Sequence, residues 1–319
     1  TAPASPTGAD CPAGESPCLE PDRLPTLDVR VDQVFWHEVE LGKLHFNTGK
    51  TPGHYQLRDL HWQAPGQVLS LEGEWNHRWG RRQTRLKGLL QLEGLDQTLS
   101  RLGWPGVVRE TPARFEVSLN WPGGPPQFAL DQLGGTVALV LGKGGLPRVD
   151  PGLGRVLGLL NLDTLWRRLN FDFSDLFGEG LAYDGVKGLL RLEQGQVLTD
   201  GLLIDAVPAR ILVSGRAGLL QHDLDQTVTV IPRTTAALPI AGALAGGPAV
   251  GAAVFVAQRL LGDQVDNITA SHYRVTDSWQ SPRMEKMPRG PSLEWLNRAW
   301  QKLETLSGLT PAKQPNEQE

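Results

Sequence analysis

Side chains whose chemistry suits catalysis or metal binding are few in this chain, and they are scattered along it. The seven histidines include His54 and His61, which lie near each other but occupy polar positions of a predicted strand. Metal sites usually need three or four converging ligands. We therefore interpret these histidines as residues of a solvated strand face, and we expect neither a metal nor a cofactor.

Other motifs that could carry chemistry have simpler interpretations. The segment LGKGGLP at 141–147 lacks the spacing and the Ser or Thr of a phosphate-binding loop, so it predicts a hairpin turn. The sequence contains no GxSxG or HExxH motif. Helix capping and turn formation explain an acidic group around Gly178 and Gly180, formed by Asp172, Asp175, Glu179 and Asp184. We expect no catalytic residue and no enzymatic activity.

The two cysteines, Cys11 and Cys18, lie in the segment CPAGESPC within a leader rich in Pro, Gly and Ser. Zinc usually takes four ligands, and the chain has no second pair of cysteines. We favour a local disulfide formed in an oxidising compartment, and two free thiols are the alternative.

Apolar and charged or polar residues alternate along most of the chain, as in strands with one buried and one solvated face. In segment 113–121, for example, Phe115 and Val117 alternate with Arg114 and Glu116. The connections are short and contain Gly or Pro, as antiparallel hairpins require. We predict about eleven strands. They begin near Leu27 and continue at 38–46, 54–62, 67–77, 83–93, 113–121, 134–142, 181–193, 195–205, 208–217, 223–231 and 266–279.

These strands predict a mainly β protein, built as an elongated, curled antiparallel sheet that forms an open apolar groove. A sheet of this length must curl, close or split, and the alternation does not distinguish an open groove from a closed barrel. The residues expected to line the groove share one strand face. They are Leu69, Leu71, Trp75, Leu86, Leu90, Leu92, Phe115, Val117, Leu119, Leu190, Leu192, Leu203, Ile211, Val213, Val228 and Val230.

Helices are predicted at a few places between and after the strands. A short helix is expected at 95–102, a helical region at 153–177, and an amphipathic helix at 291–306 whose apolar residues lie on one side. The arginines of the second region belong either to a solvated helix face or to a contact with the phosphate of a lipid headgroup. They are Arg155, Arg167 and Arg168.

A run without charged side chains extends from Thr234 to Gln258. It is long enough to cross a bilayer, but Pro and Gly divide it into two short apolar helices at 236–245 and 248–261. These helices could touch a membrane face, form a buried cap or span the membrane. The residues expected to contact a membrane, here and in the helix at 291–306, are Leu244, Val250, Val254, Phe255, Trp295, Leu296, Trp300 and Leu303.

The composition excludes one class of partner. The net charge of −4 and a pI near 6.0 provide no basic surface for nucleic acid.

The chain does not begin with Met and has no N-terminal signal segment, so we expect a fragment of a longer protein with any anchor upstream. We expect a flexible leader, two parts of a β-groove with helical insertions at 151–177 and 236–261, and an amphipathic helix with a disordered tail; their bounds are 1–25, 26–150, 151–282 and 283–319.

Residues 151–282 carry a family resemblance. The segments are PGLGRVLGLLNLDTLWRRLNFDFSDLFGEGLAYD, GVKGLLRLEQGQVLTDGLLI, DQTVTVIP, LPIAGALAGGPAVGAAVFVAQ and YRVTDSWQSP. This region resembles the C-terminal part of the YhdP family, which belongs to the AsmA-like group of large envelope proteins in Gram-negative bacteria. Two turns depart from the family pattern, since Asp277 stands where Gly is usual and DAVPA at 205–209 replaces a more Gly-Pro-like turn.

The resemblance implies a bridge-like lipid transporter. Its expected location is the periplasm, with an inner-membrane anchor in the upstream part of the same polypeptide and the C-terminal end near the inner leaflet of the outer membrane. The expected partners are phospholipids, whose acyl chains the groove would shield from water in support of outer-membrane lipid homeostasis. The alternative is a structural or assembly scaffold of the cell envelope that does not transport lipid.

Overall fold

The computed structural model describes residues 20–36, 39–78, 81–101, 103–147, 180–233 and 270–288. Several sequence-based expectations fall outside these residues. They are the disulfide of Cys11 and Cys18, the headgroup contacts of Arg155, Arg167 and Arg168, and the membrane contacts of Leu244, Val250, Val254, Phe255, Trp295, Leu296, Trp300 and Leu303.

The described part of the chain is dominated by fourteen strands in one sheet. Its helical pieces are η1 (Pro21–Arg23), α1 (Leu95–Arg101) and η2 (Pro125–Gln127). The strands are β1 (Asp28–Trp36), β2 (Val39–Thr51), β3 (His54–Ala64), β4 (Gln67–Arg78), β5 (Arg81–Leu92), β6 (Ala113–Pro122), β7 (Gly134–Leu141), β8 (Gly144–Pro147), β9 (Gly180–Glu193), β10 (Gln196–Ala206), β11 (Ala209–Gly218), β12 (Asp223–Pro232), β13 (Ser271–Ser278) and β14 (Ser281–Met287).

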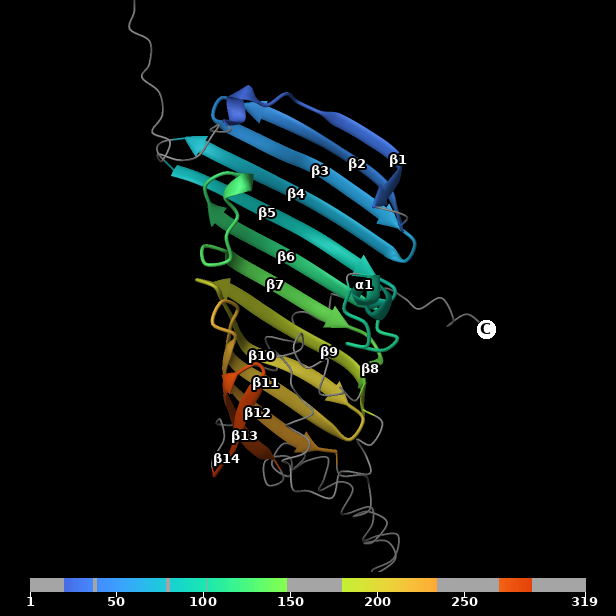
Figure 1. Ribbon diagram of the computed structural model, residues 1–319, viewed down its shortest axis with the longest axis vertical. Coiled ribbons are helices and arrows are strands. Elements are labelled where there is room, and N and C mark those ends of the chain that lie inside the picture. Colours follow the sequence, from blue (N-terminus) through green and yellow to red (C-terminus); the bar gives the residue numbers. More distant parts are fainter. Residues whose placement is uncertain are drawn as a thin grey trace, which may run out of the picture.

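The strands pair in chain order from β1 to β14, and every pairing is antiparallel. The short β8 lies off this path and pairs with β9. Figure 1 shows the strands stacked along the long axis of the molecule. The thirteen strands of the path, at about 4.8 Å per step, give the sheet a length of roughly 58 Å along the stacking direction.

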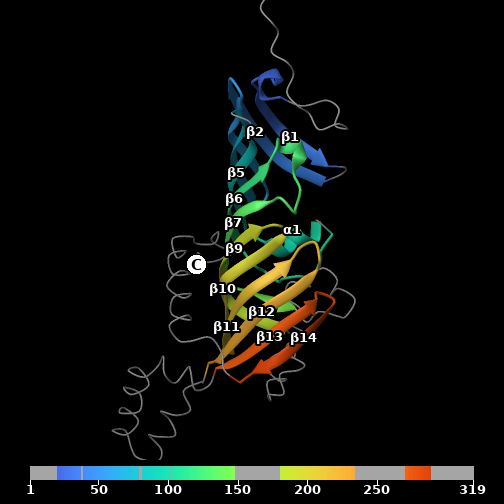
Figure 2. The same ribbon diagram turned by 90° about the vertical axis from the view of Figure 1, so that its left-hand side faces the viewer.

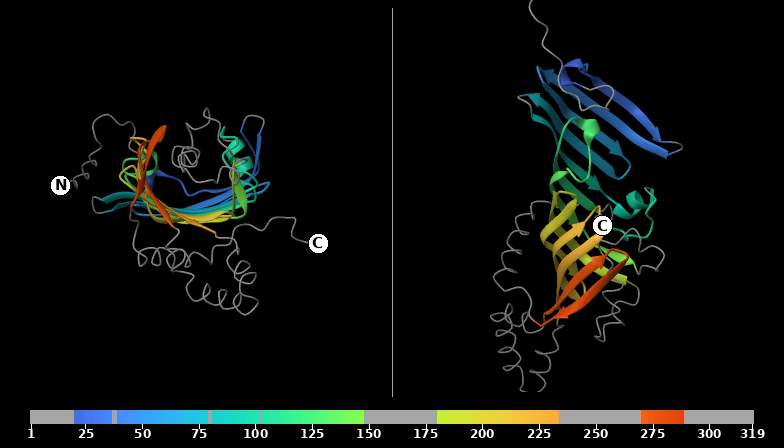
Figure 3. Two further views of the ribbon diagram at one scale, coloured as in Figure 1. Left: turned by 90° about the horizontal axis from the view of Figure 1, so that it is seen from below. Right: turned by 60° about the vertical axis from the view of Figure 1, so that its left-hand side comes forward.

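The sheet is curled and open. The edge strands β1 and β14 lie at opposite ends of the strand order and do not pair with each other, so the sheet does not close into a barrel. Seen from below, it forms a trough, and α1 and the loop containing η2 lie on its concave side (Figure 3). The side view shows that the strands from β10 onward turn strongly around this concave side (Figure 2). The predicted mainly β, curled antiparallel fold is therefore confirmed.

Two strands and one turn differ from the sequence-based prediction. The segment 141–147 was expected to be a hairpin turn, but after Lys143 the chain forms β8, which pairs with β9 and not with the preceding β7. The sheet also continues beyond residue 279 into β14, which reaches Met287. Both strands are short and rich in Gly, Pro or charge, so neither shows the alternation on which the prediction relied. The predicted helix at 95–102 is confirmed as α1.

Near the end of β13, the backbone adopts an unusual conformation at Asp277. Asp277 has a φ of 75°, which lies in the left-handed region. A Cβ atom causes steric strain in this region, and glycine avoids the strain because it has no Cβ. The family resemblance leads us to expect glycine at this position, and glycine adopts this backbone conformation without strain. Asp tolerates the conformation better than most residues, and its carboxylate lies 3.6 Å from the Arg283 guanidinium.

This geometry predicts how substitutions at position 277 rank. Asp277→Gly should be more stable than Asp277→Ala by about 1 kcal/mol, because Ala places a Cβ in the left-handed region without any compensating polar contact. Chemical denaturation of the two variants measures this difference in the free energy of unfolding. Equal stabilities, or a more stable alanine variant, would contradict the assigned backbone conformation.

Candidate functional site: an apolar inner face

The concave side of the sheet, called here the inner face, carries a continuous series of apolar residues. Directly opposed residues of an antiparallel pair lie on the same face, so the register identifies this series strand by strand. One such row crosses the sheet from β1 to β13. It consists of Val31, Leu44, Trp62, Leu69, Leu90, Phe115, Leu139, Gly188, Leu202, Val213, Val228 and Tyr273.

All but one of the residues expected to line the groove share this inner face. The exception is Leu203, which pairs with Lys187 and Leu212 on the opposite, outer face. A bulge causes the difference, because β10 has one extra residue between Thr199 and Leu202 compared with both neighbouring strands. The expectation for Leu203 is therefore wrong, and Leu202 and Ile204 occupy the inner face in its place.

The inner face differs in burial between its two ends. In β4–β7 most of the lining side chains are half-buried, including Leu69, Leu90, Phe115 and Val117. From β10 to β13 most of them are buried and form one hydrophobic cluster with the first residues of β9, in which Ile211 has no exposed surface, whereas Leu190 and Leu192 of β9 are half-buried. The N-terminal part of the inner face therefore presents an accessible apolar surface, and the C-terminal part has the burial of a core.

Glycines on the inner face make room for leucines of neighbouring strands. A Cβ built at Gly88 would overlap Leu71, and one built at Gly188 would overlap Leu202. Each leucine therefore folds down over a glycine instead of standing away from the sheet. This arrangement flattens the floor of the trough while keeping it apolar.

The rim of the trough carries Trp121 and Phe128, which were not among the residues expected to line the groove, beside Trp75, which was. The loop with η2 bends over the inner face, where Trp121 Nε1 donates a hydrogen bond to the Gly124 carbonyl at 3.0 Å and Trp75 packs against Gly124. Phe128 stacks edge-on to Trp121 with ring centroids 5.4 Å apart and remains half exposed. The Pro- and Gly-rich spacing of this loop gave no periodic signal for these contacts.

A buried pair of hydroxyl groups lies at the other margin of the inner face. The Tyr183 and Thr111 hydroxyl oxygens are 2.8 Å apart, and both residues are almost fully buried. Burial raises the pKa of the Tyr183 phenol, which stays a neutral partner for Thr111. Because each hydroxyl has a partner, the contact serves as a satisfied packing interaction and provides no nucleophile.

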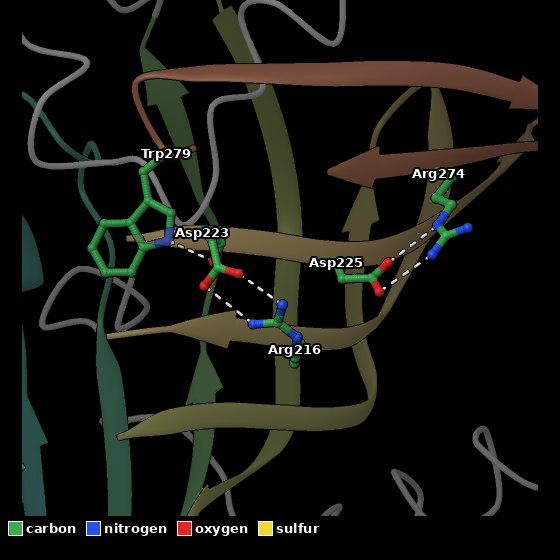
Figure 4. A network of polar contacts seen from close by, with 5 residues as sticks. All are labelled: Arg216, Asp223, Asp225, Arg274 and Trp279. Carbon is green, nitrogen blue, oxygen red and sulfur yellow. Dashed lines mark hydrogen bonds and ion pairs between the residues drawn. The ribbon is translucent and has the colours of Figure 1, made fainter. Parts of the chain in front are cut away.

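The outer face carries paired charges. Figure 4 shows Arg216 bound to Asp223 through two hydrogen bonds of 2.7 and 3.1 Å, and Arg274 facing Asp225 at 3.2 and 3.3 Å. Trp279 Nε1 donates to the Asp223 carbonyl at 3.0 Å, which ties the last turn to this network. Each ion pair joins neighbouring strands diagonally, two residues away from direct opposition, and so favours one register.

The charge pairs shift the ionisation of their acidic members. The Arg216 guanidinium holds the pKa of Asp223 below its usual range. Further along the outer face, a hydrogen bond from Arg85 at 2.9 Å and a weaker contact from His54 lower the pKa of Glu74. Asp223 and Glu74 therefore keep their negative charge to a lower pH than unpaired carboxylates would.

The histidines and acidic residues considered from sequence have separate partners. His54 contacts Glu74 at 3.3 Å, and His61 contacts the Ser70 hydroxyl at 3.0 Å. Asp184 lies 3.5 Å from Arg233. Among the described residues, no three His, Cys, Asp or Glu side chains converge as metal ligands would. The other acidic residues of that group, Asp172, Asp175 and Glu179, lie outside the described residues.

Within the described ranges, no helix combines the length and the apolar character needed to cross a bilayer.

Comparison with known proteins identifies the family of this chain. The family model described as "YhdP protein" matches residues 3–284. This chain belongs to the YhdP family. It is 32% identical over 227 residues to the "Intermembrane phospholipid transporter YhdP" of Escherichia coli (strain K12), a match that covers 71% of this chain and 18% of that relative. The chain thus spans less than a fifth of the length of this YhdP relative, and no solved structure matches it.

The difference in burial along the inner face predicts different costs of truncation. Ile211→Ala should lower the free energy of unfolding by about 3 kcal/mol, because it leaves a cavity in a packed cluster. Leu90→Ala should cost less than half as much, since its side chain is already half exposed. Denaturant titrations of both variants test this, and equal losses would show that the two ends of the trough are packed alike.

The outer-face network makes a prediction about pH. Because Arg216 lowers the folded-state pKa of Asp223, the pair stabilises the fold above the unfolded-state pKa and loses this effect as pH falls through the folded-state pKa. Arg216→Ala should raise the pKa of Asp223, as measured by NMR titration of its carboxyl carbon. Arg274→Ala, which removes the partner of Asp225, is the matched control and should leave that pKa unchanged.

Proposed function

We propose that this chain is a segment of a conduit for phospholipid between two membranes, with acyl chains lying on the inner face and headgroups remaining in water. The observation that carries the proposal is the accessible apolar inner face of β4–β7, opposite a polar outer face in a sheet that does not close. Membership of the YhdP family and the name of the Escherichia coli relative support the same class of cargo.

The energetics of acyl transfer favour a surface of this kind. Each exposed CH₂ costs about 0.8 kcal/mol in water, so an acyl chain of about sixteen carbons would cost roughly 13 kcal/mol if it crossed unshielded. A continuous apolar floor lowers this cost at every step along the trough. The role requires no bond making or breaking, so the inner face needs no catalytic group.

The proposed location follows from the same relative. The name of that relative, an intermembrane transporter, supports a position between two membranes. We place the chain in the periplasm, between an inner membrane that holds an upstream anchor of the same polypeptide and the inner leaflet of the outer membrane. In this arrangement the apolar segment 236–261 contacts the membrane, and Arg155, Arg167 and Arg168 contact headgroup phosphates.

A second candidate function is a scaffold of the envelope that does not transport lipid. The buried cluster in β9–β13 favours it, because those inner-face residues are packed as a core and leave little surface for a lipid. The two functions make opposite predictions for the half-buried inner face of β6, which a scaffold would not use.

Photo-crosslinking on β6 distinguishes the two functions. Neighbouring residues of this strand point to opposite faces, with Phe115 on the inner face and Glu116 exposed on the outer face. A benzophenone amino acid at position 115 should crosslink to phospholipid in Gram-negative cells, and the same group at position 116 should not. Equal crosslinking at both positions, or none at 115 in a folded protein, would count against the conduit.

A charge on the inner face should block lipid without unfolding the sheet. Val117→Asp places a carboxylate on the half-buried apolar floor, where an unpaired charge is strongly disfavoured. We expect the amount of phospholipid that copurifies with the chain to fall at least about tenfold, a loss that corresponds to about 1.4 kcal/mol of binding free energy. Mass spectrometry of extracted lipid measures the loss.

Ser118→Asp is the matched control for this variant, because the next residue of β6 lies exposed on the outer face. It adds the same charge and should retain the lipid. Circular dichroism of both variants separates loss of binding from loss of fold. A folded Val117→Asp protein that keeps its phospholipid would refute the proposed lining.

A further inference from the structure

The outer face contains a row of residues of which three are more buried than a one-layer sheet allows. The row crosses β7 to β14 through directly paired residues. It consists of Val140, Lys187, Leu203, Leu212, Thr229, His272 and Met287. Val140 and Thr229 are each 1% exposed and Leu212 is 6% exposed, although all three point away from the trough.

Polar groups beside this row are also shielded from water. Arg114, the partner of Val140 on β6, has a buried Nε with no hydrogen-bond partner in the described part of the chain. Burial lowers the pKa of His272, which accepts or donates a 3.0 Å hydrogen bond with the Thr229 hydroxyl. Elsewhere on the same face Ser118, Lys87 and Arg191 are exposed. The shielding therefore follows the row and is not a property of the whole face.

This burial requires a second layer over the row. Neither α1 nor η2 can supply it, because both lie on the opposite side of the sheet (Figure 3). We propose that the amphipathic segment 291–306 of this chain docks on the outer face along the row from Met287 towards Val140. The proposal concerns this surface alone and does not depend on the proposed lipid role.

The position at which the chain leaves the sheet favours this occupant. β14 ends at Met287, which is itself the last residue of the row, so segment 291–306 begins beside it after a short connection. As a helix, these residues measure about 24 Å. Five inter-strand steps of about 4.8 Å make the same length, which brings the helix from β14 to β9, one step from Val140 on β7.

The distribution of apolar residues also favours this segment over 236–261. In 291–306 the residues Leu293, Leu296, Trp300 and Leu303 share one side, and charged or polar residues occupy the other. Such a helix buries one stripe against a sheet and leaves its other side in water. The run from Thr234 to Gln258 has no charged side, so it would not match a row that contains Lys187 and ends beside Arg114.

This placement competes with the membrane contact that the sequence suggested for the same helix, because one apolar stripe cannot face the sheet and a bilayer at once. Thiol labelling distinguishes them. In the full chain with Cys11→Ser and Cys18→Ser, a thiol introduced by Leu212→Cys should react slowly with a maleimide. Adding Leu296→Asp and Trp300→Asp should accelerate the reaction at least about tenfold. The two charges weaken docking of the helix, so the thiol is exposed to the maleimide for a larger fraction of the time.

Thr305→Asp is the matched control, because position 305 lies on the polar side of the helix and its charge should leave the labelling rate unchanged. Circular dichroism confirms that each variant keeps its β structure. Fast labelling with the unmodified helix would overturn the proposal. So would protection that survives the paired substitutions and is removed by Val250→Asp, which would assign the cover to 236–261.

Vesicles of phosphatidylethanolamine and phosphatidylglycerol supply the remaining arm of the test. Protection of the thiol at position 212 should persist when they are added in excess. If the vesicles abolish protection, the apolar stripe belongs to the membrane and the docked placement is wrong.

Discussion

The structure depends on one constraint: each strand must keep its apolar residues in phase with those of both neighbours across an open sheet. Hydrogen-bond register couples these phases, because a slip by one residue exchanges the two faces of a strand. The row from Val31 to Tyr273 shows that the phase is kept from β1 to β13. Ion pairs such as Arg216–Asp223 on the outer face favour the same register.

Bulges maintain this phase where the sequence breaks its alternation. In β3 the register shifts between Leu57 and Leu60, so two leucines that an unbroken strand would place on opposite faces both lie on the inner face. The shift in β10 has the same effect for Thr199 and Leu202. Each bulge thus accommodates one extra residue in its strand, and the apolar residues on either side of the bulge stay on the inner face.

These bulges also mark the limit of what could be predicted from sequence. Alternation was sufficient to predict an antiparallel sheet and the residues that share one face wherever a strand is regular, but it could not distinguish an open sheet from a closed barrel. It misplaced Leu203 because the phase was carried through Asp200 and Gly201, although a glycine inside a strand is a signal for a bulge. The alternation could not predict how buried each residue is, because it shows which face of the sheet a residue occupies and not what covers that face.

The contrast in burial along the inner face has a physical reason. A strand whose apolar side chains stay half exposed gains less from the hydrophobic effect than one whose side chains are buried, so β4–β7 alone would be weakly stabilised. The ladder joins them through β7 and β9 to the cluster around Ile211, where side chains are packed as in a core. Because strands in one ladder share hydrogen bonds and cross-strand contacts, the packed end restrains the register of the open end. A trough can therefore keep an accessible apolar floor when the adjoining strands of the same sheet supply the burial that the floor lacks.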